Sequence, residues 1–356
     1  MGLLQKSISQ ENYQNMAKRA VLLVNLGSPD SPNVPDVKKY LDEFLMDGRV
    51  IDAPYLLRAF LVKGIILNTR PKKSAEAYKS IWWEEGSPLI VLSERLQQKV
   101  SEYSELPVGM AMRYGNPSIE AGIKSLAEEN SDLEELLLVP LYPHYAMSSY
   151  ETVVEKAKDV LKKKFPKLKL KVKKHFFDNE DYLDILADSI KSGLPDEYDH
   201  LLFSYHGIPE RHVRKSDITK GHCLGANDCC SSSSPAHEFC YRHQVFETTK
   251  SVVKRLGIPQ EKHSSSFQSR LGRDPWLQPF TDMLINDFPA KGIKKLVVVC
   301  PAFVSDCLET IEEIGIEARE EFLKHGGEEF TLIPCLNEND SWAKLLATWG
   351  ESEFKK

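Results

Sequence analysis

His206 is the first residue of this sequence whose type and position suggest chemistry. It directly follows the apolar, β-prone residues 201–205 and precedes the turn residues 207–209, so we expect it on an exposed turn at the end of a buried strand. An imidazole titrates near neutral pH, and its free nitrogen ligates divalent transition metals. His206 could therefore accept protons or bind a metal. A histidine that only caps the turn is the alternative.

Three glutamates, Glu309, Glu313 and Glu317, form a second candidate site because they are spaced four residues apart. Capping residue types at its start and a glycine pair at its end predict one helix over 305–325. One helix would stack the carboxylates in a stripe, where like charges destabilise it by roughly 0.2–0.5 kcal/mol per pair unless a divalent cation offsets them. A solvated helix face is the alternative. Because the stripe follows a buried strand, we expect Glu309 at the mouth of the same cleft as His206.

A Pro- and Gly-containing segment at 266–282 is expected to form an ordered loop between these two sites. It contains Trp276 and Phe280, which offer flat apolar surfaces, and Arg270 and Arg273, which offer positive charge. This combination suits an aromatic ligand that bears carboxylates. Packing of the aromatic side chains against the loop is the alternative.

Four of the seven cysteines lie within the segment GHCLGANDCCSSSSPAHEFC at 221–240. They are Cys223, Cys229, Cys230 and Cys240. Four thiolates are the number needed to hold a [2Fe–2S] cluster or a structural zinc ion. Their spacing lacks the C-x2-C pattern common in zinc sites, which favours the iron–sulfur cluster; zinc, or no metal, is the alternative. The other three cysteines are expected to be buried residues, and the odd total favours a reducing compartment.

Short apolar runs alternate with longer amphipathic segments along the chain. The predicted strands are 21–26, 136–141, 168–177, 201–205, 296–300 and 330–336. The predicted helices include 117–129, 150–164, 182–192 and 246–256. This alternation predicts βαβ units with buried parallel strands, and so an α/β fold. Lysines alternate through 168–177, so we expect that strand at the edge of its sheet.

Two pairs of segments resemble each other and suggest an internal duplication. Residues 22–29 and 201–209 each run from a strand into a Gly-x-Pro turn, and 136–157 and 296–318 each run from a strand through a proline-aromatic loop into a helix. Ligands bind at the carboxyl ends of strands in open α/β sheets, so the cleft between two such halves is the expected site. A chance similarity between buried strands is the alternative.

The bulk composition excludes several classes of protein. A length of 356 residues suffices for two medium domains, and a net charge of -6 argues against nucleic acid as a partner. No stretch approaches the roughly 20 apolar residues that span a bilayer, and the first residues lack the apolar core of a secretory signal. We therefore expect a cytoplasmic protein.

Several long motifs, collinear over residues 20–340, resemble the ferrochelatases, specifically the form common in Gram-negative bacteria. They are LLVNLGSP at 22–29, MRYGNP at 112–117, LYPHYAMSSYET at 141–152, SYHGIPER at 204–211, SFQSRLGRDPWL at 266–277 and CPAFVSDCLETIEEIG at 300–315. The resemblance implies two Rossmann-like domains of type II chelatase architecture, at 20–180 and 181–340, followed by a C-terminal helix or tail at 341–356. It also implies a porphyrin clamped between the domains.

The resemblance implies roles for individual residues as well. His206 matches the active-site histidine that removes pyrrole protons and coordinates metal, and Glu309 matches the carboxylate facing it. Glu313 and Glu317 match an acidic ridge that leads away from the site, with Glu313 as a further metal ligand. Residues that match the porphyrin pocket or its propionate contacts are Arg70, Tyr78, Ser87, Arg113, Tyr114, Trp276 and Phe303. Cys307 stands where animal members have a histidine.

The reaction implied by the resemblance is insertion of ferrous iron, a substrate, into protoporphyrin IX to form protohaem. A non-catalytic porphyrin or haem carrier, and a chelatase for another metal or for coproporphyrin III, are the alternatives. Some ferrochelatases carry a [2Fe–2S] cluster, although the animal ligand set cannot apply here, since Met147 occupies one of its positions. The apolar segment 53–70 matches a lip over the pocket, which suggests peripheral contact with the inner face of the membrane; a buried helix is the alternative.

Overall fold

Two parallel β-sheets form the framework of the protein in a computed structural model, which describes residues 18–270, 272 and 274–355. The first sheet has the order β2-β1-β3-β4 and contains β1 (Arg19–Asn25), β2 (Val108–Met112), β3 (Glu135–Pro140) and β4 (Lys169–Val172). The second has the order β6-β5-β7-β8 and contains β5 (His200–His206), β6 (His263–Gln268), β7 (Lys295–Val299) and β8 (Glu329–Leu332). All strand pairs are parallel. The α/β fold is confirmed, and the matching strand order is what a duplicated unit would give.

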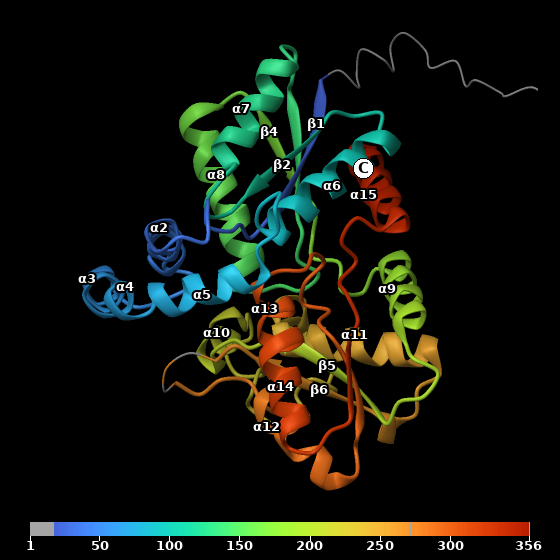
Figure 1. Ribbon diagram of the computed structural model, residues 1–356. Helices are drawn as coiled ribbons and strands as arrows, with labels where there is room; N and C mark the ends of the chain where they lie inside the picture. The colour runs from blue at the N-terminus through green and yellow to red at the C-terminus, as the bar shows by residue number, and fades with distance from the viewer. Residues whose placement is uncertain (1–17, 271, 273, 356) are drawn as a thin grey trace, which may run out of the picture.

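Helices flank both sheets, one unit above the other in Figure 1. The helices that precede β5 are α2 (Val34–Leu45), α3 (Tyr55–Ala59), the π-helix η1 (Phe60–Ile66), α4 (Leu67–Thr69), α5 (Pro71–Ile81), α6 (Pro88–Tyr103), α7 (Ile119–Glu129), α8 (Thr152–Lys164) and α9 (Glu180–Gly193). Those that follow it include α10 (Glu210–Ser216), α11 (Tyr241–Leu256), α12 (Thr281–Asp287), α13 (Leu308–Ile311), the π-helix η6 (Glu313–Ala318), α14 (Arg319–Lys324) and α15 (Asp340–Glu353). Helices α2 to α5 project to one side of the first unit.

Local sequence explains where several of these helices begin and end. Ser118 accepts a hydrogen bond from Ala121 N at the start of α7, and Asn179 and Asn339 do the same for α9 and α15. Gly257 ends α11 with a positive φ of 66°, a conformation that costs glycine little. The predicted helices at 117–129, 150–164, 182–192 and 246–256 are thus found within one turn or so of their expected bounds.

The last helix, α15, returns to the first unit and packs against α6 (Figure 1). Its Trp342 and Trp349 lie 5.5 and 5.0 Å from the ring of Phe176, and Trp342 also contacts Tyr182. These residues belong to one hydrophobic core that also contains inward-facing side chains of β1, β3, β5 and β7. The two sheets are therefore joined by a continuous apolar interior, and the domain boundaries at 180 and 340 stay a prediction.

Two strands were missed, and one predicted helix is interrupted. Strands β2 and β6 were not predicted, because β2 is short and β6 (HSSSFQ) is polar, and β6 occupies the start of the segment expected to be a loop. The segment 305–325 is not one α-helix, because the π-helix η6 separates α13 from α14. The edge position expected for 168–177 is confirmed by β4.

No helix in the described ranges is long and apolar enough to cross a membrane. The N-terminal segment at 1–17 and Arg273, both used in the sequence analysis, lie outside the described residues.

Candidate active site

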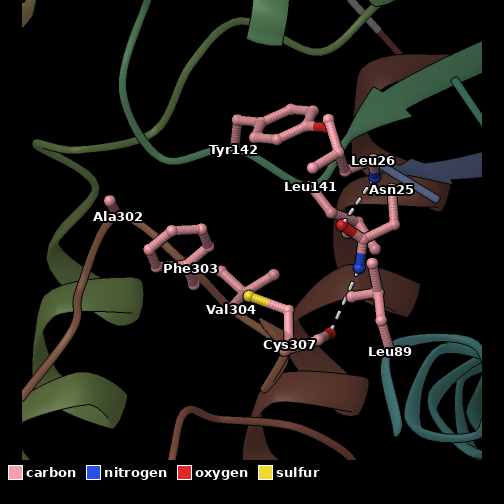
Figure 2. Close-up of a pocket in the computed structure, with 10 residues that line it drawn as sticks. Asn25, Leu26, Leu89, Leu141, Tyr142, Ala302, Phe303, Val304 and Cys307 are labelled. Carbon is pink, nitrogen blue, oxygen red and sulfur yellow. Dashed lines mark hydrogen bonds between the residues drawn. The ribbon is translucent and has the colours of Figure 1, made fainter. Parts of the chain in front are cut away.

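A pocket lies between the two units, where loops that follow β1, β3 and β7 meet (Figure 2). Its lining residues are Asn25, Leu26, Leu89, Leu141 and Tyr142 from the first unit and Ala302, Phe303, Val304, Ser305 and Cys307 from the second. Asn25 Nδ2 donates to Ser93 Oγ (3.1 Å) and to Ser305 Oγ (3.3 Å), so one buried amide ties the two units together beside the pocket. Of the predicted site residues, Phe303 lines this pocket, whereas His206 and Glu309 are not among its lining residues, so the porphyrin cleft between the halves stays a prediction.

His206 is the last residue of β5 and is half-buried at this edge of the second sheet. Its Nδ1 lies 2.6 Å from the carbonyl oxygen of Gly207, and a carbonyl can only accept, so Nδ1 carries the proton. Nε2 of the neutral ring is then left with a free lone pair. The imidazole lies 6.2 Å from the ring of Phe303, and the hydroxyl of Tyr241 donates to the His206 carbonyl (2.8 Å), which fixes the backbone.

Gln268, which the sequence analysis did not single out, connects His206 to the glutamates. It is the last residue of β6 and pairs directly with His206 across the sheet. Its Nε2 donates to the backbone carbonyl of Glu309 (2.7 Å) and to Glu313 Oε2 (3.4 Å), while its Oε1 accepts from Ser204 (2.7 Å). Gln268 could have been found as the residue at the end of a strand, as His206 was. The polar composition of β6 (HSSSFQ) hid that strand.

Glu309 and Glu313 face different neighbours. Burial raises the pKa of Glu313 and the Glu309 carboxylate raises it further, whereas a hydrogen bond from Ser269 opposes the shift, as does His206 when its ring is protonated. The pKa of the Tyr78 hydroxyl is raised by burial first and by Glu309 second, and the same two causes raise that of Cys307. Glu309 therefore raises pKa values in both units, at Tyr78 in the first and at Cys307 in the second. The pKa of Glu313 depends on both His206 and Glu309.

The acidic stripe differs from the regular α-helical one expected from the spacing. The π-turns of η6 begin at Glu313, so the side chains beyond that residue do not follow the α-helical register. Glu312, not predicted as a site residue, joins the group instead: burial, Glu317 and Glu313, in that order, raise its pKa to about 7, against the opposing charge of Lys73. A carboxyl group of this kind can hold or release a proton near neutral pH.

Arg113 and Tyr114 lie in a buried network around Asp47. The Arg113 guanidinium pairs with Asp47 and donates from Nε to Thr152 Oγ1 (2.8 Å), and Tyr114 donates to Asp47 (2.9 Å). Tyr114 is fully buried, and the Arg113 side chain is 11% exposed. Their role in porphyrin binding stays a prediction.

The other predicted pocket residues of the first unit surround α5. Tyr78 is buried on α5 with its ring edge toward Trp82 (6.2 Å), and Ser87 is buried at the start of α6. Arg70, at the start of α5, is exposed, and no ion pair to it is found within the described ranges. Arg70 is therefore free to meet an anionic group.

In the second unit, Trp276 and Phe303 are both partly exposed. Trp276 bridges to the backbone of Pro209, which holds it close to the His206 turn. Arg270 pairs with Asp282 (2.9 Å) and lies over the ring of Phe280 (4.3 Å), so the expected packing within the loop accounts for these two side chains.

The lip predicted at 53–70 is an exposed apolar surface and not a buried helix. Leu56 is 82% and Phe60 66% exposed, and Tyr55, Leu57 and Ile65 are exposed as well. Asp52, only 6% exposed, anchors its base: it accepts from Arg211 (2.6 Å) and pairs with Lys215, both on α10 of the second unit. The lip is thus attached to both units.

The four clustered cysteines are free thiols connected by mutual contacts. Cys240 interacts with Cys223 and with Cys230, and Cys230 interacts with Cys229; Cys230 is half-buried and the other three are buried. Asp217 accepts from the backbone N–H groups of His222 and Cys223 and so fixes the start of the loop. Nevertheless, no three His, Cys, Asp or Glu side chains in the described part of the chain already stand in a metal-holding arrangement.

The raised pKa of Glu312 predicts a stability that depends on pH. A carboxyl whose folded pKa (about 7) exceeds its ordinary value stabilises the fold at low pH, and that stability is lost as the pH rises through about 7. We expect Glu312→Gln to unfold at a higher temperature than the wild type at pH 8, with a difference that shrinks as the pH falls and vanishes below the ordinary pKa of 4.5. Glu320→Gln, at an exposed position on α14, should show no such trend. If the unfolding temperatures of Glu312→Gln and Glu320→Gln changed with pH in parallel, the raised pKa of Glu312 would be contradicted.

Comparison with known proteins matches these features to one family. The sequence model described as "Ferrochelatase" matches residues 18–353. A curated "Ferrochelatase" from Azotobacter vinelandii is 51% identical over 335 residues, which cover 93% of this chain and 98% of that protein, and one from Pseudomonas syringae pv. tomato is 49% identical over 332 residues, 93% of this chain and 97% of that protein.

A solved structure is similar to this fold at much lower sequence identity. "SirB from Bacillus subtilis with Fe3+" superposes with a TM-score of 0.51 at 12% identity and covers 95% of this chain and 97% of its own, which supports the chelatase fold alone. The family match over nearly the whole chain and the identity of about one half decide the relationship: this chain belongs to the ferrochelatase family.

Proposed function

We propose that this chain inserts ferrous iron into protoporphyrin IX to form protohaem, with His206 and Glu309 at the point of insertion. Its family is that of the ferrochelatases, so it is a metal chelatase of haem biosynthesis whose substrates are a porphyrin and ferrous iron. The observation that carries the residue assignment is the end of β5, where His206 has an unprotonated Nε2 and interacts electrostatically with Glu313, which in turn interacts with Glu309.

Insertion exchanges one ferrous ion for two protons on the pyrrole nitrogens, so the site must accept protons while it delivers a cation. The free Nε2 of His206 is the base. Glu313, whose pKa is raised by burial, can take the proton on, and Glu312 and Glu317 continue the ridge toward solvent. Glu309 can hold the ferrous ion, because carboxylate oxygen and imidazole nitrogen both suit this metal.

The flat porphyrin must bend before a metal can reach its nitrogens. Trp276 and Phe303 would press on the ring, and a rigid cleft that fits a bent ring binds the transition state better than the flat substrate. The Asn25 bridge between the units supports that rigidity. Arg70 is the best-placed partner for a propionate, because it is exposed and unpaired in the described ranges. Tyr78, Ser87, Arg113 and Tyr114 would shape the pocket behind it.

A carrier without turnover would need stacking and propionate contacts, but it would not need a histidine with a free nitrogen that interacts with a partly buried carboxylate, as His206 does with Glu313. We expect His206→Ala to lose about 10²–10⁴-fold in turnover, as is typical when a general base is removed, and to retain porphyrin binding. Anaerobic assays with ferrous iron and protoporphyrin IX, followed by absorbance, measure both. His325→Ala, at an exposed histidine on the surface, is the matched control. Near-normal turnover of His206→Ala would refute the role of His206.

We further propose that Cys223, Cys229, Cys230 and Cys240 hold a [2Fe–2S] cluster. The donors are right in number and kind, because contacts connect all four thiols within one loop, but binding would have to draw them together, since no three of the described donors already stand in a metal-holding arrangement. Cys240 and burial raise the pKa of Cys230, so that thiol is protonated until a metal displaces its proton. When bound, such a cluster supplies a one-electron redox centre and crosslinks the loop.

Purified anaerobically, the wild-type protein should be coloured, with iron and acid-labile sulfide in equal amounts. Cys230→Ser should lose both, whereas Cys335→Ser, outside the loop, should keep them. A colourless protein fully occupied by zinc would establish the alternative structural site.

We also propose peripheral contact of the lip with the cytoplasmic face of a membrane. Five exposed apolar side chains within 55–65, together with Arg58 and Lys63, form the kind of surface that inserts among lipid headgroups. The wild type should float with vesicles of phosphatidylethanolamine and phosphatidylglycerol. The double variant Leu56→Glu and Phe60→Glu should not float, and Met283→Glu, at a 56% exposed apolar position on α12, should behave as the wild type. Absence of the wild type from the floating fraction would exclude the contact.

A further inference from the structure

Arg242 lies two residues after Cys240, in the first turn of α11, and its guanidinium points at the adjacent cysteine pair. Nη1 donates to the sulfur of Cys229 at 3.6 Å and to that of Cys230 at 3.5 Å. The backbone N–H of Leu224 donates to the Cys229 sulfur as well (3.4 Å). Two sulfur atoms of the proposed ligand set therefore share one cation.

Arg242 differs from the other arginine of α11 in its partners. Arg255 forms ion pairs with Asp184 and Glu180. For Arg242, no carboxylate partner is found in the part of the chain that the structure describes; its guanidinium lies over the ring of Phe246 at 5.2 Å, and the side chain is half-buried. A partly buried cation that hydrogen-bonds to sulfur is poorly compensated unless those sulfurs carry negative charge.

Three histidines hold the cysteine pair in this orientation. His222 and His237 both direct Nε2 at the carbonyl oxygen of Cys229 (2.6 and 2.9 Å), and Nδ1 of His243 lies 2.8 Å from the carbonyl oxygen of Cys230. His237 and His243 also stack on each other at 3.6 Å. With both carbonyls engaged, the backbone of the pair is fixed, and the two sulfurs remain beside Arg242.

We infer that Arg242 is the counter-cation of the metal-bound thiolates of Cys229 and Cys230, retaining the metal and making the cluster easier to reduce. The inference rests on the proposed cluster. A [2Fe–2S] centre with four thiolates carries two negative charges when oxidised and three when reduced, so an adjacent cation stabilises the reduced state more than the oxidised state. Hydrogen bonds to the sulfurs act in the same direction.

The test compares Arg242→Gln with Lys250→Gln, which removes an exposed charge from the same helix away from the thiols. Potentiometric titration followed by absorbance should show that Arg242→Gln shifts the one-electron equilibrium at least about tenfold toward the oxidised state, which corresponds to 59 mV. Metal release to a chromogenic chelator should be several-fold faster. Lys250→Gln should match the wild type in both measurements.

Arg242→Lys keeps the charge without the planar guanidinium, and it should fall between the wild type and Arg242→Gln. It also provides the comparison if Arg242→Gln does not accumulate as folded protein. Equal potentials and equal release rates in the Arg242 variants and Lys250→Gln would overturn the role of Arg242. If the wild type holds zinc, the cluster proposal fails, but faster zinc release from Arg242→Gln would still support the counter-cation. A metal-free wild type would overturn both.

Discussion

The parallel register of β5 with its neighbours is the constraint on which the candidate site depends. Parallel strands end at the same edge of a sheet, so the ends of β5, β6 and β7 deliver His206, Gln268 and the loop before α13 to one place. A slip of one residue in β5 would turn the His206 side chain to the opposite face of the sheet. The side chains of Ser204 and Gln268 meet at 2.7 Å, an arrangement that requires the observed register.

Partly buried carboxylates occur in two arrangements in this structure, either beside cations or beside one another. Where a buried carboxylate has cationic partners, as Asp52 has in Arg211 and Lys215, its pKa falls and the pair fastens one unit to the other. Where carboxylates are buried beside one another, as in Glu312 and Glu313, their pKa values rise. The first arrangement supports the geometry, and the second raises the pKa of Glu312 to about 7, so that this group can exchange protons near neutral pH.

The cysteine loop is connected to the lip through a short series of contacts. Asp217 fixes the start of the loop, and it directly follows α10, whose Arg211 and Lys215 hold Asp52 at the base of the lip. Arg242 and the three histidines act on the other side of the loop, where they fix the cysteine pair.

Local features of the sequence, namely apolar strands, turn residues and clustered thiols, were enough to predict the α/β class, the duplicated order of elements, His206 at a strand end and the four-cysteine loop. Motifs collinear over most of the chain also determined the family. The polar segment of β6 is a strand because its pairing with β5 overrides its composition, and this pairing, which the sequence does not show, places Gln268 opposite His206. The π-helix η6 broke the regular spacing of the glutamates and added Glu312, whose pKa depends on burial among neighbours distant in sequence. The sulfur contacts of Arg242 were equally invisible in the sequence, because a side chain's partners are set by packing and not by its place along the chain.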